Sequence, residues 1–364
     1  MTLTNREKEI IQLIRNKPMI SQQEIANALE ITRASVAVHI TNMMKKGYIL
    51  GKEYVLNDDN YTIAIGGANM DISGFPTSQL IEHDSNPGKV KLSSGGVARN
   101  IAENLVHLGN RVKLVTTLGN DLYGKRIIED AQAVGLDMQD SFILSDMATS
   151  TYVSIMDADG DMHVSINHMD IMDHLDVEMI TSKRHLIESA RTIILDTNIP
   201  ETVIDFMMTK YHDHRIFVDP VSSKKALKIK KHLKHIHILK PNRIEAEILS
   251  GIKIKTEADV KKAANYFIRQ GVGKVFISLG SEGVYYADKK KQGKFTPKPQ
   301  PLINANGAGD AFSAGLIYTD LLEYDIEDMA KFGSAAAVVA LQHENTINPS
   351  LSIETVEKAL KNIS

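Results

Sequence analysis

A short stretch near the C-terminal end combines residues that suit an anion with one that could remove a proton. Gly307-Ala308-Gly309 lets the backbone approach a ligand closely, and the apolar run 311–322 that follows predicts a helix. The N-terminus of a helix offers free N–H groups and the positive end of its dipole, so this turn suits a phosphate. Asp310 stands at its mouth and could accept a proton from an attacking hydroxyl. By themselves, these residues are equally compatible with an ordinary turn and an N-cap aspartate.

Three segments together resemble the motifs of the PfkB (ribokinase-like) family of sugar and nucleoside kinases. Gly307-Ala308-Gly309-Asp310 is similar to the second signature of that family, and Ser94-Gly95-Gly96-Val97-Ala98-Arg99-Asn100 to the first. Between them, Lys240-Pro241-Asn242-Arg243-Ile244-Glu245 contains the Asn-x-x-Glu element. The motifs occur in the order of the family, and the resemblance covers residues 61–364. It implies an α/β fold: a ribokinase-like, central, mainly parallel sheet flanked by helices, with a β-lid at about 72–92 and 151–168.

The composition is that of an ordinary globular protein. The chain has 364 residues, 43% of them apolar and 24% charged, with a net charge of −3. The absence of cysteine excludes disulfides and thiolate metal sites. No apolar signal region or membrane-spanning run is present, so we expect a cytoplasmic protein without a membrane partner.

Residues 1–57 precede the kinase-like part and predict a small helical module. Thr4-x-x-Glu7 and Ser21-x-x-Glu24 are capping boxes, and Thr32 could cap a third helix. Gly47 would end that helix, and the stretch 48–56 suits a two-stranded wing. This order resembles the winged helix-turn-helix domains of bacterial regulators.

The third helix of this module lies in a locally basic stretch. Between Ile31 and Lys52 there are four basic residues and no acidic one. In a winged helix this segment would reach the DNA groove and its phosphates, with contacts predicted from Arg33, Ser35, His39, Asn42 and Lys45. The alternative is a dimerisation or docking module with a solvated basic face.

On the substrate side, the candidate polar residues either follow a predicted strand or stand at the start of a predicted helix. The strand 61–65 leads into Asn69 and Asp71, and ligands of open α/β sheets lie at the carboxyl ends of strands. Asn-x-Asp after a strand is also common turn chemistry. The family resemblance implies that Asp71 holds sugar hydroxyls, that the sugar lies against Gly95 and Gly96, and that Asn100 contributes to the same site.

Other substrate contacts are implied by position within the family. Thr151 in the lid could read a base, as could His163 and Asn167, for which surface positions are favoured. Asn198, two residues before Pro200, stands where ribokinases have a sugar-binding Glu. An amide there favours a nucleoside over free ribose. The variant Gly-Gly-Val-Ala-Arg-Asn at 95–100 is similar to the pseudouridine kinase branch and counts against an ordinary ribokinase.

The C-terminal part carries the residues expected to bind nucleotide. Asn242 and Glu245 are three apart on a predicted helix, and the family uses this pair to hold Mg2+ beside the phosphates. The strand 275–279 leads to a loop that carries the nucleotide in the family. The implied nucleotide contacts are Asn242, Ser278, Gly280, Gly283 and Ala308, with the helix 333–341 beside the adenine.

The second signature departs from the family pattern at two positions. Asn304 replaces an Asp that helps to bind a monovalent cation in ribokinases, so dependence on K+ stays open, and nothing explains Asn306. The resemblance implies ATP-dependent, Mg2+-dependent phosphorylation of a nucleoside 5′-hydroxyl, pseudouridine first, by a homodimer with Asp310 as general base. The alternatives are an inosine/guanosine or sugar kinase, or a transcription regulator that only senses a ligand.

Overall fold

The structure is a computed structural model that describes residues 3–17, 20–49, 61–304 and 306–363. The chain divides into two compact units: residues 1–60 with 184–190, and residues 61–183 with 191–364. Among the described residues, no helix has the length and apolar character needed to cross a bilayer.

Three helices form the body of the first unit: α1 (Asn5–Asn16), α2 (Gln22–Ala28) and α3 (Arg33–Lys45). The expected capping boxes at Thr4/Glu7 and Ser21/Glu24 are present, and Thr32 caps α3. Apolar side chains from all three helices meet in one core, among them Ile10, Ile14, Ile25, Val36, Ile40 and Met43. The wing is predicted over 48–56, and its residues 50–56 lie outside the described residues. The unit also includes α7 (Arg184–Glu188).

An ion pair ties the end of α3 to the start of α1. Lys46 Nζ donates to both carboxylate oxygens of Glu7, at 2.8 and 2.7 Å. Glu7 also accepts from the backbone N–H of Thr4. Burial opposes the charge of Glu7, but these hydrogen bonds outweigh it and hold its pKa below the ordinary value.

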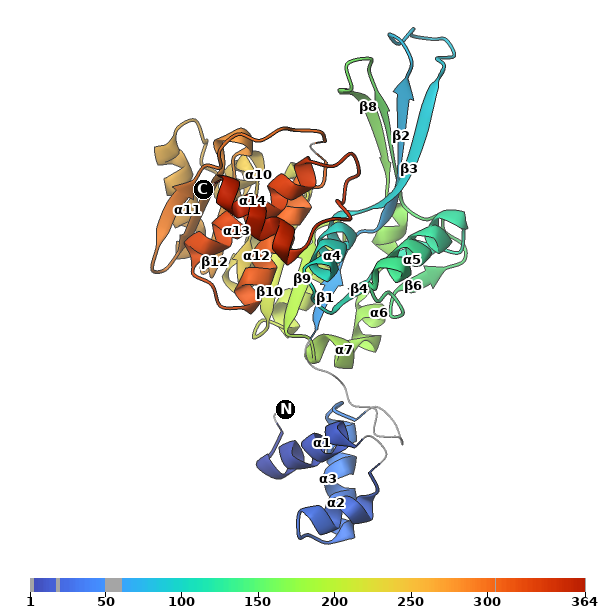
Figure 1. The fold of residues 1–364 in the computed structure, drawn as a ribbon, viewed down its shortest axis with the longest axis vertical. Coiled ribbons are helices and arrows are strands. Elements are labelled where there is room, and N and C mark those ends of the chain that lie inside the picture. The colour runs from blue at the N-terminus through green and yellow to red at the C-terminus, as the bar shows by residue number, and fades with distance from the viewer. Residues whose placement is uncertain (1–2, 18–19, 50–60, 305, 364) are drawn as a thin grey trace. The chain divides into compact units, whose positions relative to one another are not determined.

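The second unit is built on an eight-stranded sheet (Figure 1). Its strand order is β14 (Gln292–Phe295), β13 (Val284–Asp288), β12 (Lys274–Ser278), β11 (Ile238–Leu239), β10 (Arg215–Asp219), β9 (Thr192–Asp196), β1 (Thr62–Ile65) and β4 (Val112–Val115). The six strands from β12 to β4 are parallel to their neighbours, whereas β13 and β14 are antiparallel. The predicted α/β fold with a mainly parallel sheet is confirmed.

Helices cover both faces of this sheet. Along the sheet, the strands β9 to β12 follow one another in one direction, whereas the step from β1 to β4 runs in the other. Because crossovers between parallel strands are right-handed, the helices of these two sets of connections lie on opposite faces. In Figure 1, α4, α12 and α13 lie in front of the sheet. These helices are α4 (Val97–His107), α12 (Ala308–Leu321) and α13 (Ile326–Leu341), and α14 (Ile353–Ile363) packs on α13. The β9–β12 crossovers use α8 (Glu201–Lys210), α9 (Ser223–Ala226), η2 (Leu227–His235), α10 (Arg243–Ser250) and α11 (Glu257–Arg269).

A separate four-stranded sheet, the lid, projects from the second unit (Figure 1). Its order is β3 (Gly88–Gly95), β2 (Asn69–Pro76), β7 (Thr151–Met156) and β8 (Met162–His168), in which only β2 and β7 are parallel. The remaining elements are β5 (Thr117–Gly119), β6 (Phe142–Leu144), α5 (Leu122–Val134), η1 (Asp170–His174), α6 (Val177–Ser182) and η3 (Gly280–Glu282).

The two faces of the lid differ in polarity, because successive residues of a strand point to opposite sides. The register aligns Leu92, Ile72, Val153 and Ile166 in one row, and Val90, Gly74, Ile155 and Val164 in the next. The opposite face carries Asp71, Tyr152 and Asn167 in one row, with Lys91, Ser73, Ser154 and Ser165 in another. The lid is therefore apolar on one side and polar on the other.

Candidate active site

The turn before α12 has the conformation that the glycine-rich motif predicts. Gly307 is the N-cap of α12 with φ of 78°, a left-handed conformation that favours glycine. A Cβ on Gly307 would lie 1.9 Å from the carbonyl oxygen of Thr346, so the loop after α13 leaves no room for a side chain. The turn thus points its N–H groups outward from the start of a helix, which is the arrangement that binds anions.

Asp310 is directed across the molecule rather than back at its own helix. It lies in the first turn of α12, and its Oδ2 accepts a hydrogen bond of 2.9 Å from Asn100 Nδ2 on α4. Burial, followed by the nearby charge of Asp219, raises the pKa of Asp310 to about 7. The alternative that Asp310 is only an N-cap is wrong, because Gly307 is the cap. A carboxylate with this pKa is suited to accept a proton near neutral pH.

The first motif brings Asp71 and Asn100 to the same end of the sheet. Gly96 begins α4, and a Cβ on Gly95 would lie 2.2 Å from Asp71 Oδ2, so the carboxylate lies against the backbone of β3. Asn69 Nδ2 donates to Asp71 Oδ1 at 2.6 Å. Burial raises the pKa of Asp71 to about 6, although Asn69 and Arg99 favour its charged form.

Asn100 keeps an unused acceptor in this site. The residue is 5% exposed, and its Oδ1 accepts no hydrogen bond from the part of the chain that the structure describes. A buried amide oxygen without a partner is costly, and a ligand hydroxyl would satisfy it. Asn100 therefore has a buried acceptor, Oδ1, that the described residues leave unpaired.

Thr151 and Asn198 are less available than the sequence suggests. Thr151 pairs with Met70, on the apolar face of the lid, whereas Asp71 pairs with Tyr152. Asn198 Nδ2 donates to Asp196 Oδ2 at 3.0 Å, and Asn198 Oδ1 accepts from Lys225 Nζ at 2.6 Å. The structure thus separates Thr151 from the face of Asp71 and already engages the amide of Asn198 within the protein.

The predicted metal pair forms a capping box. Asn242 caps α10, with its Oδ1 accepting from Glu245 N–H at 2.9 Å, while Glu245 Oε2 accepts from Asn242 N–H at 2.8 Å. Glu245 is 3% exposed, and burial raises its pKa. Ser278 bridges to Asn242 at the end of β12, and Gly280 and Gly283 shape the turn that follows. These nucleotide-side residues lie at neighbouring strand ends.

Charged residues that sequence reasoning missed end the central strands. Asp196, Asp219 and Lys240 follow one another at the carboxyl ends of β9, β10 and β11. Asp196 is fully buried and accepts from the N–H groups of Gly67, Ala98 and Asn198. The rule that selected Asp71, polar residues after a buried strand, could have found all three.

Lys240 is a cation that lies beside one of these carboxylates, Asp219. Its Nζ lies 2.9 Å from Asp219 Oδ2. Burial opposes its charge, but Asp219, Asp310 and Glu245 outweigh that effect and hold the pKa of Lys240 above its ordinary value. The site therefore contains a positive group that none of the predicted residues supplies.

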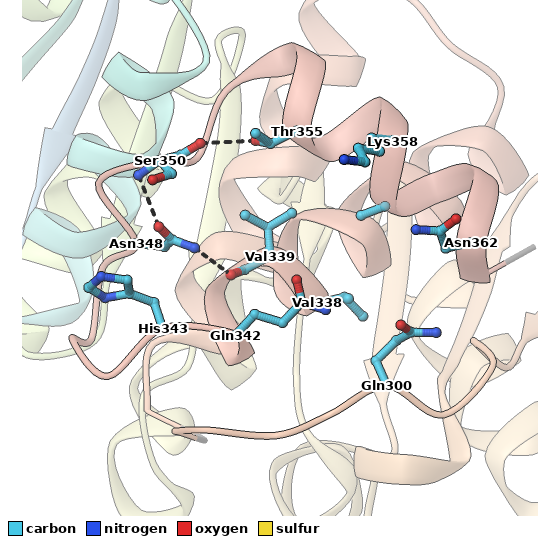
Figure 2. A pocket seen from close by; sticks show the side chains of 11 residues that line it. Gln300, Val338, Val339, Gln342, His343, Asn348, Ser350, Thr355, Lys358 and Asn362 are labelled. Carbon is cyan, nitrogen blue, oxygen red and sulfur yellow. Dashed lines mark hydrogen bonds between the residues drawn. The ribbon is translucent and has the colours of Figure 1, made fainter.

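A pocket of about 370 Å³ opens between α13 and α14 (Figure 2). Valine side chains and polar groups line it together: Gln300, Val338, Val339, Gln342, His343, Asn348, Ser350, Thr355, Lys358, Ala359 and Asn362. Asn348 is fixed in its wall, since its Nδ2 donates to Val339 O and its Oδ1 accepts from Ser350 N–H. The loop that carries His343 also packs on the anion-binding turn, through Asn304 Nδ2 to Glu344 O and Thr346 O beside Gly307.

The predicted DNA-contacting residues occupy one helix of the first unit. Arg33, Asn42 and Lys45 are exposed on α3, and Ser35 and His39 are half-buried. The Ser35 hydroxyl lies 2.9 Å from that of Thr32, so the start of the helix engages it. Val38, which sequence reasoning missed, is 59% exposed on the same helix.

Comparisons with known proteins agree with both units. A family model described as pfkB family carbohydrate kinase matches residues 59–353, and a winged helix-turn-helix DNA-binding model matches residues 3–49. The uncharacterized sugar kinase YeiI of Escherichia coli K12 is 37% identical over 97% of this chain and 98% of its own length. The pseudouridine kinase of the same organism is 37% identical over 84% of this chain and 98% of its own.

Solved structures give the same result. A sugar kinase from Clostridium perfringens superposes with a TM-score of 0.76 at 37% identity, covering 85% of this chain and 98% of its own. A ribokinase from Thermotoga maritima, 23% identical over 83% of this chain and 99% of its own, has a TM-score of 0.73 and shows the shared fold. The chain therefore belongs to the PfkB family of carbohydrate kinases and carries an additional N-terminal winged helix-turn-helix domain.

Proposed function

We propose that this kinase transfers the γ-phosphoryl group of ATP to the 5′-hydroxyl of a nucleoside, with pseudouridine as the first candidate. The observation that carries the proposal is the placement of Asp310. Its carboxylate adjoins the anion-binding turn Gly307–Gly309 and is hydrogen-bonded to Asn100 of the opposite motif. A base between a phosphate site and a hydroxyl site is what phosphoryl transfer to an alcohol requires.

In the proposed reaction, the ribose is held at the end of β2 and the start of α4. Asp71 and the free Oδ1 of Asn100 accept hydrogen bonds from its hydroxyls, and Gly95 and Gly96 let the ring lie close to the backbone. The 5′-oxygen forms a bond to the γ-phosphorus, its proton passes to Asp310, and ADP leaves with the electron pair of the broken P–O bond. The N–H groups of residues 307–309 stabilise charge on the transferring group.

The nucleotide side is compatible with Mg2+ bound through phosphates. No group of three or more His, Asp or Glu residues that could hold a metal exists among the described residues. Mg2+ needs no such cage, because it usually keeps water and binds one or two carboxylates together with phosphate oxygens. Glu245, with the amide of Asn242, is the proposed protein contact, and the bound ion would neutralise charge on the phosphates. Ser278, Gly280, Gly283 and Ala308 would line the phosphates and ribose.

We place the adenine along α13, toward the pocket of Figure 2. The loop 342–348 lines the pocket and also contacts the segment that leads into the anion-binding turn. The valines and amides of the pocket suit a flat base with polar edges. A K+ site would lack a carboxylate ligand at position 304, because this residue is Asn304. Its side-chain amide is already hydrogen-bonded, since Nδ2 donates to Glu344 O and Oδ1 accepts from the N–H of Asn306.

Pseudouridine is favoured over other acceptors on two grounds. The Gly-Gly-Val-Ala-Arg-Asn motif is similar to that of pseudouridine kinases, and the E. coli pseudouridine kinase is 37% identical. The guanosine-inosine kinase of Exiguobacterium acetylicum is 25% identical over 80% of this chain, which makes inosine and guanosine the next candidates. Tyr152 and Asn167 share a lid face with Asp71, and we propose that they contact the base.

The test is ADP release with ATP·Mg2+ against pseudouridine, uridine, inosine, guanosine, ribose and fructose. Turnover on pseudouridine alone supports the proposal, and turnover on inosine or a sugar overturns the substrate assignment. Absence of turnover on all six, with nucleoside binding retained, favours the alternative of a ligand-sensing regulator.

We further propose that α3 binds DNA. The chain matches a winged helix-turn-helix DNA-binding model, and α3 exposes Arg33, Asn42 and Lys45 with Val38 between them. Basic groups would contact phosphates, while Asn42 and Val38 could read base edges and thymine methyls. A gel shift with the promoter region of its own gene, with and without nucleoside, tests this; no retention in either condition would refute it.

The lid supports a homodimer. Its apolar face exposes Val90 and Leu92 on one edge strand, β3, and Val164 and Ile166 on the other, β8, and Ile166 is 68% exposed. Contiguous apolar surface of this kind marks an interface. A second copy of the same face is the proposed partner, since two identical sheets can cover each other with two-fold symmetry.

A further inference from the structure

The first turn of α4 contains a charge that the helix itself disfavours. Arg99 is the third residue of α4, where the positive end of the helix dipole repels a cation and an acidic residue is the usual choice. The residue is nonetheless only 3% exposed. A buried cation at this end of a helix is costly, so its contacts with other groups must account for its presence.

The guanidinium group of Arg99 connects α4 with strand β3. Its Nη1 donates to the carbonyl oxygen of Ser94 at 3.1 Å, and its Nη2 lies 2.6 Å from Glu103 Oε2, one turn further along α4. Its Nε is buried and has no hydrogen-bond partner among the described residues. Glu103 therefore balances the charge of Arg99, while the hydrogen bond to Ser94 fixes the guanidinium beside the end of β3.

The same end of β3 contacts Asp71 of the neighbouring strand β2. A Cβ on Gly95 would lie 2.2 Å from Asp71 Oδ2, so the carboxylate lies against Gly95. The Asp71 carboxylate and the Arg99 guanidinium thus contact two consecutive residues of one strand, Gly95 and Ser94. Burial raises the pKa of Asp71 to about 6, and the charge of Arg99 opposes that effect.

We propose that Arg99 is a positioning residue that acts on the substrate through Asp71, holding this carboxylate ionised so that it can accept hydrogen bonds from the sugar hydroxyls. An ionised carboxylate accepts at both oxygens, whereas a protonated one gives up part of that capacity. Arg99 exerts this effect by its charge, from the place that Ser94 fixes, and does not touch the substrate itself. The inference rests on the proposed role of Asp71 in the substrate site.

Other titratable groups face this region from the elements packed against it. They are Glu103 and His107 on α4, Asp130 with its partner Arg126 on α5, Asp310 on α12, Lys91 of β3 with its partner Glu344, and Tyr152 on β7. The two variants compared below share all of these groups except Glu103, which is changed in both. A difference between their pH profiles can therefore be assigned to Arg99.

The competing explanation is that Arg99 and Glu103 form an ion pair that only stabilises α4. Arg99→Met alone would leave Glu103 buried without its partner and could unfold the protein. The comparison is therefore between Glu103→Gln and Arg99→Met/Glu103→Gln, which differ only in the arginine. Arg126→Met is the matched control, because it removes an exposed pair with Asp130 at the same i, i+4 spacing on the adjacent helix.

The experiment measures the dissociation constant of pseudouridine by calorimetry from about pH 5 to about pH 9, together with the unfolding temperature of each variant. Inosine replaces pseudouridine if inosine is the nucleoside that is turned over. We expect the inflection in log Kd to lie about one pH unit higher in the double variant than in Glu103→Gln, the lower end of the effect of an adjacent opposite charge. This shift weakens binding roughly fivefold near pH 6 and leaves the two variants equal near pH 9. Arg99→Lys, which keeps the charge, and Arg126→Met should both retain the wild-type inflection.

Three outcomes overturn the inference. The double variant and Glu103→Gln could share one pH profile and differ only in unfolding temperature. The double variant could bind more weakly by the same factor at every pH. Arg99→Lys could shift the inflection as far as the double variant does, which would show that the charge is not the cause.

Asp71→Asn separates this failure from that of the proposed function. If Asp71→Asn binds the nucleoside as tightly as wild type, or if the wild type binds neither pseudouridine nor inosine, the proposed sugar site itself is wrong and the inference falls with it. If Asp71→Asn binds weakly while the two Glu103 variants share one pH profile, only the role of Arg99 fails.

Discussion

Asn100 Nδ2 donates a hydrogen bond of 2.9 Å to Asp310 Oδ2, joining two residues that are 210 positions apart in the chain. The contact connects α4, which opens at the first motif, to α12, which opens at the second. It orients the carboxylate of the proposed base toward the region where the substrate side and the phosphate side meet. The activity of the enzyme should therefore depend on this pair as a unit.

Replacing Asp310 by Asn removes the proton acceptor while keeping the shape of the side chain. We expect kcat to fall by ~10²–10⁴-fold, the usual contribution of a general base, with ATP affinity retained. Steady-state kinetics and calorimetry on the same preparation measure both quantities. Near-normal turnover would remove Asp310 from the role of base.

The activity should depend on pH through two carboxylates. A base must be ionised, and the pKa of Asp310 is raised to about 7, so kcat/KM should fall as the pH drops through 7. Asp71, with a pKa of about 6, adds a second protonation, and the slope of log kcat/KM should approach two below pH 6. Asn100→Ala removes a hydrogen bond to the charged form of Asp310 and should move the upper inflection to higher pH. An unchanged profile in that variant contradicts the proposed coupling.

The anion-binding turn should not tolerate a side chain at Gly307. Its φ of 78° and the 1.9 Å approach of Thr346 O to a Cβ mean that Gly307→Ala must displace the turn. We expect loss of nucleotide binding measured by calorimetry. Gly251→Ala is the matched control, because Gly251 also has a positive φ, of 73°, with nothing near its Cβ. Equal behaviour of the two variants would show that the crowding at Thr346 has no consequence for nucleotide binding.

A charge on the apolar face of the lid should dissociate the proposed dimer. Ile166→Asp places a carboxylate in the row Leu92, Ile72, Val153 and Ile166, where burial against a second copy would be costly. Light scattering after size exclusion should show half the wild-type mass. Ser165→Asp introduces the same charge on the opposite face and should leave the mass unchanged. A wild-type monomer would exclude the interface at the outset.

DNA affinity should depend on the exposed basic residues of α3. Arg33→Ala and Lys45→Ala each remove one proposed phosphate contact and should lower the salt dependence of binding by about one unit of log–log slope. Fluorescence anisotropy at several salt concentrations measures this slope. Lys17→Ala, which loses only an exposed pair with Glu24, should behave as wild type. A Lys17 effect as large as that of Arg33 would indicate non-specific attraction instead.

Local patterns in the sequence determined the elements and most of the motif positions. The capping boxes at Thr4 and Ser21 and the cap at Thr32 follow from hydrogen bonds within three residues, which is why they were predictable. The motifs resembling the PfkB family predicted the parallel sheet and the lid, both of which the structure contains.

Tertiary structure decided which of these residues meet. The hydrogen bond from Asn100 to Asp310, the pairing of Lys240 with Asp219, and the contact of Lys225 with Asn198 join distant segments, so no local pattern encodes them. Strand register alone separated Thr151 from Asp71, because neighbouring strands fix which residues share a face. The raised pKa of Asp310 likewise comes from burial and from Asp219, two features created only when the strands and α12 come together. The sequence determined which catalytic and binding side chains this protein has, and tertiary packing determined which of them lie together.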